Sequence, residues 1–251
     1  MSPSAIPLLQ DFHANLDLDH ARARARLKLM QMEADAQVER AGVLAEKLTP
    51  EMERAVIDPL LWLQKFTTTR DPHWREAGAE TPYRPFPDKP YFRPILEALQ
   101  NEPIVFVCKA RDLMLSWLCV GYFTHLAMTT PGVEVLVQSQ TEDKASELID
   151  YAKVLYDHQG PELKNKFKVA GPVWKQSWLE LNFAHGSRLV GIPHGADKIR
   201  SYHPTALFID EAAFVPDAGE SFDEAISACQ KIAVVSSANV GWFESVCVSA
   251  D

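Results

Sequence analysis

Two adjacent acids follow a short apolar run in the last quarter of the chain. Leu207, Phe208 and Ile209 precede Asp210 and Glu211. A strand this apolar is expected inside a parallel sheet. Such a strand places the two acids at the carboxyl end of the sheet, where α/β proteins bind ligands. One acid can hold Mg²⁺ through its hydration shell, and the next can polarise an attacking water. The pair therefore indicates ATP hydrolysis, although Asp-Glu also ends plain solvated strands, which is the commoner meaning of an isolated match.

An ATP site also needs a loop that cradles phosphates between the first core strand and the next helix. Residues 109–116, Lys-Ala-Arg-Asp-Leu-Met-Leu-Ser, stand at this place. Against the Walker A pattern Gly-x-x-x-x-Gly-Lys-Ser/Thr, Ser116 agrees, whereas Lys109 and Met114 replace the two glycines. The loop's backbone N–H groups can still bind phosphate, Ser116 can coordinate Mg²⁺, and Arg111 adds a cation. Met114 is the weak point, because glycine permits backbone angles that a side chain obstructs; alone, the segment also fits an ordinary strand-to-helix turn.

The elements that must position these residues form an alternating pattern. From residue 103 onward, apolar strands alternate with helices, which predicts a mainly parallel sheet covered on both faces. Residues 179–183 and 188–192 alternate around a turn and predict a hairpin. The expected strands are 104–108, 133–137, 206–209 and 232–236, and the expected helices are 115–128, 142–156 and 222–229.

The first hundred residues have a different texture. An amphipathic helix is expected over residues 17–48 and a second helix from Pro50 to about Lys65, capped by Thr49. Six prolines follow in residues 70–94, so no regular element is expected there. That segment reads as a well-packed linker, or as one in which Tyr91 or Phe92 stacks on a nucleotide base.

Composition narrows the class of protein. With 251 residues, of which 47% are hydrophobic, the chain can build a large α/β core, and its formal charge of −9 excludes a protein that coats nucleic acid through net basicity. DNA contacts must come from local groups, the best cluster being Lys164, Lys166, Lys168 and Lys175, which also fits a solvated turn. Four cysteines without a Cys-x-x-Cys pair, and no apolar run of about 18 residues, indicate a reducing compartment and no membrane contact. His185, His194 and His203 lack a ligand cluster and are taken as structural.

Seven segments together resemble the large terminase subunit of tailed bacteriophages, the motor ATPase that packages DNA into proheads. The resemblance runs from about Thr69 to Ser245, and it rests on the order and spacing of the segments. Terminases have a deviant Walker A loop with the lysine at its start, as Lys109 is here. The segments are Thr69-Arg-Asp-Pro72, Pro85-Phe-Pro-Asp-Lys-Pro-Tyr91, Lys109-Ala-Arg-Asp-Leu-Met-Leu-Ser-Trp-Leu118, Gln138-Ser-Gln-Thr-Glu-Asp143, Gly191-Ile-Pro-His-Gly-Ala-Asp-Lys-Ile-Arg-Ser-Tyr202, Ile209-Asp-Glu-Ala-Ala-Phe214 and Ser236-Ser-Ala-Asn-Val-Gly-Trp-Phe243.

The resemblance implies a role for each site residue. Glu211 would activate the attacking water. Ser116 would bind Mg²⁺, and Asp210, as the Walker B acid, would hold the ion through water. Arg200 would reach into a neighbouring subunit's site, although it also fits a surface ion pair. Ser236 and Ser237 would couple hydrolysis to movement, at a strand end expected beside Asp210. The nucleotide-binding set would be Lys109, Ala110, Arg111, Asp112, Leu113, Met114, Leu115, Ser116 and Trp117.

The resemblance also implies fold and partners. We expect a three-layer α/β P-loop NTPase of ASCE type with an N-terminal helical appendage: helices over 1–68, a Pro/aromatic-rich linker and lead-in helix over 69–100, and the ATPase core over 101–251. ATP and Mg²⁺ are the expected cofactors. Double-stranded DNA, further copies in a ring, the small terminase subunit and the portal protein are the expected partners, in the host cell cytoplasm. The nuclease domain of large terminases is not expected in this sequence, so no DNA cleavage is expected.

Two alternatives stay open. The first is a catalytically silent P-loop fold that serves as a scaffold or partner-binding module, with Met114 closing the phosphate cradle. The second is another P-loop DNA translocase or helicase-like motor, against which stands the lack of a second recA-like lobe. Loss of ATP turnover in Glu211→Gln separates an ATPase from a scaffold.

Overall fold

The computed structural model of the protein describes residues 48–248, which lie in one compact unit. The amphipathic helix expected over residues 17–48 falls outside the described residues except for Leu48. Residues 1–47 of the expected N-terminal helical region likewise lie outside the described residues.

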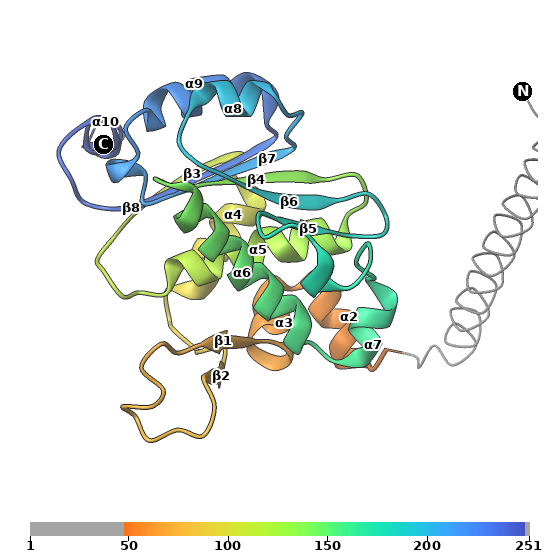
Figure 1. Ribbon diagram of the computed structural model, residues 1–251. Coiled ribbons are helices and arrows are strands. Elements are labelled where there is room, and N and C mark those ends of the chain that lie inside the picture. The colour runs from red at the N-terminus through yellow and green to blue at the C-terminus, as the bar shows by residue number, and fades with distance from the viewer. Residues whose placement is uncertain (1–47, 249–251) are drawn as a thin grey trace, which may run out of the picture. The chain divides into compact units, whose positions relative to one another are not determined.

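A six-stranded sheet forms the centre of the described unit (Figure 1). Its order is β3-β8-β7-β4-β6-β5, so one strand, β8, separates β3 from β7. Neighbouring strands are parallel except for β5, which pairs antiparallel with β6 as the predicted hairpin. Every residue of β7 is buried, as its continuous apolar run predicts. The strands are β3 (Ile104–Lys109), β4 (Glu134–Gln138), β5 (Glu180–Asn182), β6 (Arg188–Ile192), β7 (Ala206–Asp210) and β8 (Lys231–Ser237).

Helices cover both faces of this sheet (Figure 1). On one face α5 (Leu115–Thr129) is buried on nearly all sides, because the sheet, α6 (Glu142–His158) and further helices surround it. Of the helices on this face, α2 (Pro50–Ile57), α3 (Pro59–Phe66) and α4 (Phe92–Asn101) contact α5. The short helix α7 (Pro161–Lys166) lies on the same face (Figure 1). The opposite face carries a smaller apolar core under α8 (Ala196–Arg200), α9 (Ala218–Ala228) and α10 (Trp242–Val248). The three-layer α/β P-loop fold of ASCE type with a mainly parallel sheet is therefore confirmed.

The single helix expected from Pro50 to Lys65 is wrong, because the structure has two helices that meet at Asp58. Asp58 is extended, as a residue before proline prefers to be, and Pro59 opens α3 without an N–H to continue α2. The Asp58 carboxylate then accepts hydrogen bonds from the backbone N–H groups of Leu60 and Leu61. Thr49 caps α2 as predicted, through the Met52 N–H.

The proline-rich segment holds more regular structure than expected. β1 (Thr68–Arg70) and β2 (Tyr83–Pro85) form an antiparallel pair that was not expected. A helix at the place of the expected lead-in helix, α4, begins at Phe92, with Pro94 in its first turn. Proline is tolerated in both places, since Pro85 ends an edge strand and a first helical turn needs no N–H donor. The helix expected over 222–229 also begins earlier, at Ala218. Short 3₁₀ turns complete the fold: η1 (Val173–Lys175) and η2 (Ala212–Phe214).

No helix within residues 48–248 combines the length and the apolar character that crossing a membrane requires.

Candidate nucleotide-binding site

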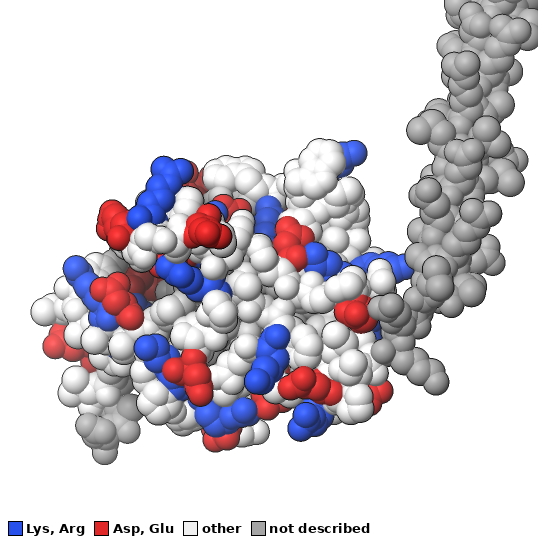
Figure 2. Space-filling model, turned by 90° about the horizontal axis from the view of Figure 1, so that it is seen from below, with Lys and Arg blue, Asp and Glu red and all other residues white. Residues whose placement is uncertain are grey.

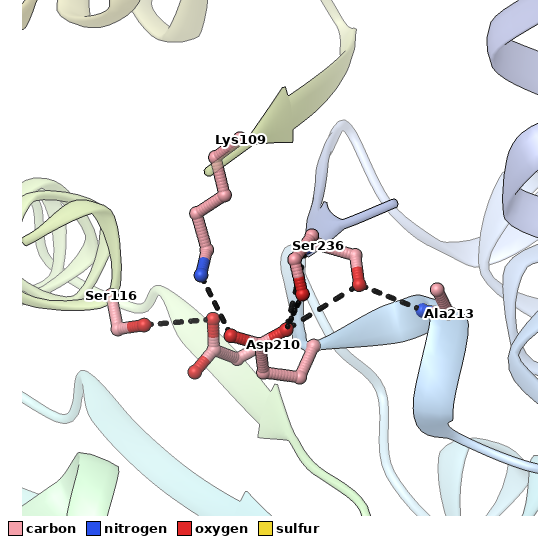
Figure 3. Close-up of polar contacts among 7 residues, drawn as sticks. Lys109, Ser116, Asp210, Ala213 and Ser236 are labelled. Atoms are coloured by element: carbon pink, nitrogen blue, oxygen red, sulfur yellow. Dashed lines mark hydrogen bonds and ion pairs between the residues drawn. The ribbon is translucent and has the colours of Figure 1, made fainter. Parts of the chain in front are cut away.

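The acid pair lies at the carboxyl end of β7, as its sequence predicts. Asp210 is buried, and Glu211 follows with φ 52°, ψ 43°, in the left-handed region that non-glycine residues rarely adopt. The two carboxylates have different partners, and Figure 3 shows Ser116 beside Asp210. Asp210 Oδ1 accepts a hydrogen bond from Ser116 Oγ at 2.9 Å, and Glu211 Oε1 contacts Lys109 Nζ at 2.6 Å.

The predicted phosphate loop, residues 109–116, connects β3 to α5 and contains two residues in the left-handed region. Asp112 has φ 60° and Met114 has φ 57°, and Met114 is the N-cap of α5 without a side-chain capping bond. Each such residue is disfavoured by about 1–2 kcal/mol relative to its usual conformation. Met114 thus adopts a backbone conformation that glycine would reach without strain, and the loop keeps its turn into α5 despite the side chain.

A single cavity of about 930 Å³ joins the loop to the acids. It is lined by Lys109, Ser116, Asp210 and Glu211. All other residues of the predicted nucleotide-binding set line it except Ala110. The predicted nucleotide-binding segment therefore lies beside the two acids, because the parallel sheet brings the ends of β3 and β7 to the same edge.

Burial and charge set the ionisation of the two acids. Burial raises the pKa of Asp210 to about 6, with the Glu211 charge adding to the effect, while the Ser116 hydrogen bond and Lys109 oppose it. Partial burial also opposes ionisation of Glu211, but the hydrogen bond and charge of Lys109, aided by Ser237, lower the pKa overall. A buried carboxylate with a raised pKa beside a hydroxyl is a site where a bound cation would restore the charged form.

The serine pair at the end of β8 contacts Glu211 rather than Asp210. Asp210 is in register with Val235, and β8 continues past this position through Ser236 to its end at Ser237. Ser237 Oγ donates to Glu211 Oε2 at 3.2 Å, and its backbone N–H does so at 3.4 Å. Ser236 Oγ lies 3.5 Å from the same oxygen and accepts from the Ala213 N–H at 3.0 Å (Figure 3). Both oxygens of Glu211 are thus held.

The cavity is also lined by residues to which the sequence analysis assigned no role. From α6 come Lys144, Glu147 and Tyr151, and from the β1–β2 pair come Arg70 and Arg84. The Tyr151 ring stacks on Trp117 at 4.0 Å between ring centroids and 10° between planes, and its hydroxyl donates to Glu147 Oε1 at 2.8 Å. Glu147 also bonds Lys144 at 3.0 Å. In the sequence the three α6 residues are ordinary members of a helix, and no signal marks them. Arg70 lies in the segment Thr69-Arg-Asp-Pro72, which had no role assigned to it.

Neither aromatic residue considered for base stacking lines the cavity. Phe92 is fully buried, and Tyr91 is half-buried. The Tyr91 hydroxyl instead donates to the Leu113 carbonyl oxygen in the phosphate loop at 3.3 Å.

Arg200 lies on α8, away from the cavity of its own chain. Its side chain is 65% exposed and pairs with Glu224. The structure therefore contains a surface ion pair of Arg200, the alternative interpretation of this residue. A reach into a neighbouring molecule stays a prediction.

The remaining candidates lie elsewhere. His185 contacts the Met128 carbonyl at 3.0 Å, and His194 lies 3.6 Å from Asp217. Within residues 48–248, no group of three or more His, Cys, Asp or Glu side chains could hold a metal ion. Basic and acidic side chains are interspersed over the face seen in Figure 2, so its described part carries no broad area of one sign.

The chain matches no protein-family model and no curated protein. Among solved structures it resembles the HK97 bacteriophage large terminase, with a TM-score of 0.56 and 13% sequence identity, over 81% of this chain and 41% of that chain. It also matches the ATPase domain of the Thermus phage P74-26 large terminase, with a TM-score of 0.46 and 15% identity, over 70% of this chain and 74% of that one. A match to the large terminase of a thermophilic bacteriophage in complex with ADP has a TM-score of 0.40 and 12% identity, over 60% of this chain and 39% of that one.

At 13% identity the HK97 match concerns the fold alone, and the chain spans 41% of the length of that terminase. The fold expected from the resemblance in sequence is the fold found. The described unit therefore has the α/β fold of a phage large terminase.

Proposed function

We propose that this chain is the ATPase unit of a viral DNA-packaging motor, which hydrolyses ATP with Mg²⁺ to drive double-stranded DNA into proheads. One observation carries the proposal: Lys109 and Ser116 of the phosphate loop meet Asp210 and Glu211 in one cavity, each within hydrogen-bond distance of an acid. The terminase fold supports the same function.

The residues fit a magnesium ion. Ser116 Oγ and Asp210 Oδ1 are two oxygens 2.9 Å apart, and the Asp210 carboxylate is buried with a raised pKa. Mg²⁺ is usually held by one or two protein oxygens while water and substrate phosphates complete its shell, so two oxygens suffice. When bound, the ion supplies positive charge to the phosphate oxygens as they become more negative.

The protein side chains supply the rest of the chemistry. Lys109 and Arg111 neutralise phosphate charge, and the N–H groups at the start of α5 bind phosphate oxygens. Glu211 accepts the proton of the attacking water. The Lys109–Glu211 ion pair must open before either side chain can act, and the incoming phosphates provide the competing negative charge for Lys109.

The serine pair connects the acid to the following segment. Ser236 accepts a hydrogen bond from η2, directly after Glu211, and Ser237 donates to Glu211 itself. A shift of Glu211 during hydrolysis therefore changes contacts at the end of β8, which leads into α10. We assign coupling to Ser236 and Ser237 on this basis.

The proposed partners follow from the same function. They are double-stranded DNA, further copies of the chain in a ring, the small terminase subunit and the portal protein, in the host cell cytoplasm. Because acids outnumber bases in the chain, contacts with DNA fall to local groups such as Lys164, Lys166, Lys168 and Lys175. Arg200 is the proposed finger that reaches the neighbouring site.

Glu211→Gln tests the catalytic assignment. The amide keeps the shape of the side chain but cannot accept the water proton, so steady-state ATP turnover should fall by about 10²- to 10⁴-fold. Binding of MgATP, measured by equilibrium dialysis, should persist, because the phosphate loop and Asp210 are untouched.

Glu97→Gln is the matched control, since Glu97 is exposed on α4 and lies outside the cavity. Its turnover should equal that of the wild type. Wild-type protein that binds no MgATP and has no turnover above background at high concentration would favour a silent scaffold instead.

A further inference from the structure

The phosphate loop keeps its shape without any glycine. Residues 109–116 contain none, yet Asp112 and Met114 both have positive φ. Side chains disfavour this conformation, so the loop must be held by the groups around it.

Apolar packing holds the loop on one side. Leu113 and Met114 are half-buried against the large core, and Leu115 is buried as the first residue of α5. Packing of this kind fixes side chains but supplies no hydrogen bond to the backbone of the loop.

Tyr91 supplies the polar contact on the backbone. Its hydroxyl donates to the carbonyl oxygen of Leu113, which lies between the two positive-φ residues. In the described part of the chain, no other side chain forms a hydrogen bond with the backbone of residues 110–114. Tyr91 does not line the cavity, so it acts on the loop from behind.

The proline- and aromatic-rich segment fixes Tyr91 itself. The Tyr91 ring contacts Phe92 edge-on at 5.2 Å, and Phe92 contacts Phe86 at 5.7 Å. Phe86 and Phe92 are both buried, so the phenol is carried by anchored neighbours. Pro90 precedes Tyr91 and restricts the backbone where the segment enters α4.

We propose that Tyr91 is a positioning residue of the phosphate loop. Its side-chain hydrogen bond stabilises a backbone conformation that glycine would adopt without strain. The proposal rests on the proposed function, because ATP is the ligand that the loop is held to receive. It gives the proline-rich segment a role in nucleotide binding without contact with the nucleotide.

Tyr91→Phe tests this, because it removes the hydroxyl and keeps the ring packing. The KM for ATP should rise about 3- to 10-fold, because the loss of one hydrogen bond has an effect of this size. The kcat should change less than about 2-fold. A purely structural role would instead lower the melting temperature and leave KM unchanged.

Tyr122→Phe is the matched control. Its hydroxyl also donates to a backbone carbonyl, that of Leu99 at 2.8 Å, but Tyr122 lies on α5 beyond the loop and outside the cavity. This variant should leave KM within about 2-fold of the wild type. Equal KM values for both variants would overturn the proposal.

A rescue variant sharpens the result. With Met114→Gly, the positive φ is no longer disfavoured, so the added Tyr91→Phe change should alter KM by less than about 2-fold. An undiminished effect of Tyr91→Phe in the Met114→Gly background would mean that the hydroxyl does not act through the loop conformation.

A measurement without nucleotide separates this proposal from the proposed function. The Leu118 amide donates to the Met114 carbonyl at 3.1 Å, at the junction of loop and helix. In ligand-free protein, Tyr91→Phe should speed hydrogen exchange at Leu118 about 3-fold or more relative to amides later in α5, and Tyr122→Phe should not. Unchanged exchange would overturn the positioning role, whereas a wild type that binds no MgATP would overturn only the proposed function.

Discussion

At the scale of single residues, the site depends on conformations that its sequence disfavours. Asp112, Met114 and Glu211 all have positive φ, and all three line the cavity. Such strain persists only where the surrounding structure holds it, and it gathers at functional sites. Met114, which closes the phosphate cradle in the scaffold alternative, adopts the left-handed conformation itself.

Substitutions at Met114 should therefore follow backbone preference rather than size. Met114→Val should lower the free energy of unfolding by about 1–2 kcal/mol or more, because a β-branched residue is a strong outlier at positive φ. Met114→Gly should lie within about 1 kcal/mol of the wild type, since relief of strain offsets lost packing and greater freedom of the unfolded chain. Urea unfolding of both variants measures this. A Val variant as stable as the Gly variant would contradict the strained conformation.

At the scale of elements, α5 links the site to the N-terminal helices. Its first turn carries Ser116 in the cavity, and its last turns carry His125, which contacts the backbone of α2. His125 Nε2 lies 2.8 Å from the Ala55 carbonyl oxygen, and the ring lies 5.5 Å from that of Trp62. Ala55 and Trp62 are fully buried, so this junction excludes water and disfavours a charged imidazole.

This junction predicts a loss of stability in mild acid. Burial lowers the pKa of His125 from 6.5 to about 4, although the Ala55 carbonyl and the Asp58 charge oppose the shift. The unfolded state then binds the proton more readily between pH 6.5 and 4, so stability is full above pH 6.5 and falls as pH decreases towards 4. The complete loss amounts to about 3 kcal/mol.

Urea unfolding at pH values between about 4.5 and 7.5 measures the slope. The raised pKa of Asp210 acts with the opposite sign below about pH 6, so the test compares two curves. The stability of the wild type should fall relative to that of His125→Gln as pH decreases from 6.5 towards 4. A slope as steep as that of the wild type would assign the acid sensitivity to other groups.

At the scale of the whole molecule, the layers divide the contacts with ligand and neighbours. The cavity opens among β1–β2, α5 and α6, while α8 and α9 lie over the other face of the sheet (Figure 1). Arg200 is exposed on that second layer and is held by Glu224. A role for Arg200 in hydrolysis therefore needs a second copy of the chain.

The specific ATPase activity should then depend on protein concentration. In the wild type it should rise steeply as copies associate, and in Arg200→Ala it should stay flat, since a finger contributes about 10³- to 10⁵-fold in turnover. Lys198→Ala is the matched control, because Lys198 is an exposed cation on the same helix. Identical concentration curves for the wild type and Arg200→Ala would remove the finger.

The sequence by itself determined the core elements and the main site candidates. Continuous apolar runs specified β3, β4, β7 and β8, because burial on both faces leaves a local pattern, and the alternation of strands with helices specified α5 and α6. Asp210 and Ser116 were identifiable since each adjoins the end of an element at the carboxyl edge of the sheet. Pro59 was a local signal for a break, and the helix expected through it was an error of interpretation.

Only the tertiary structure decided what these elements face. Sheet order places β8 beside β7, so that Ser237 contacts Glu211, and packing of α4 brings Tyr91 to Leu113 across 22 positions of sequence. Tyr151 and Glu147 joined the cavity in the same way. An amphipathic pattern tells which face of an element is buried, but not which partner buries it. The partner follows from the sheet order and packing of the whole chain.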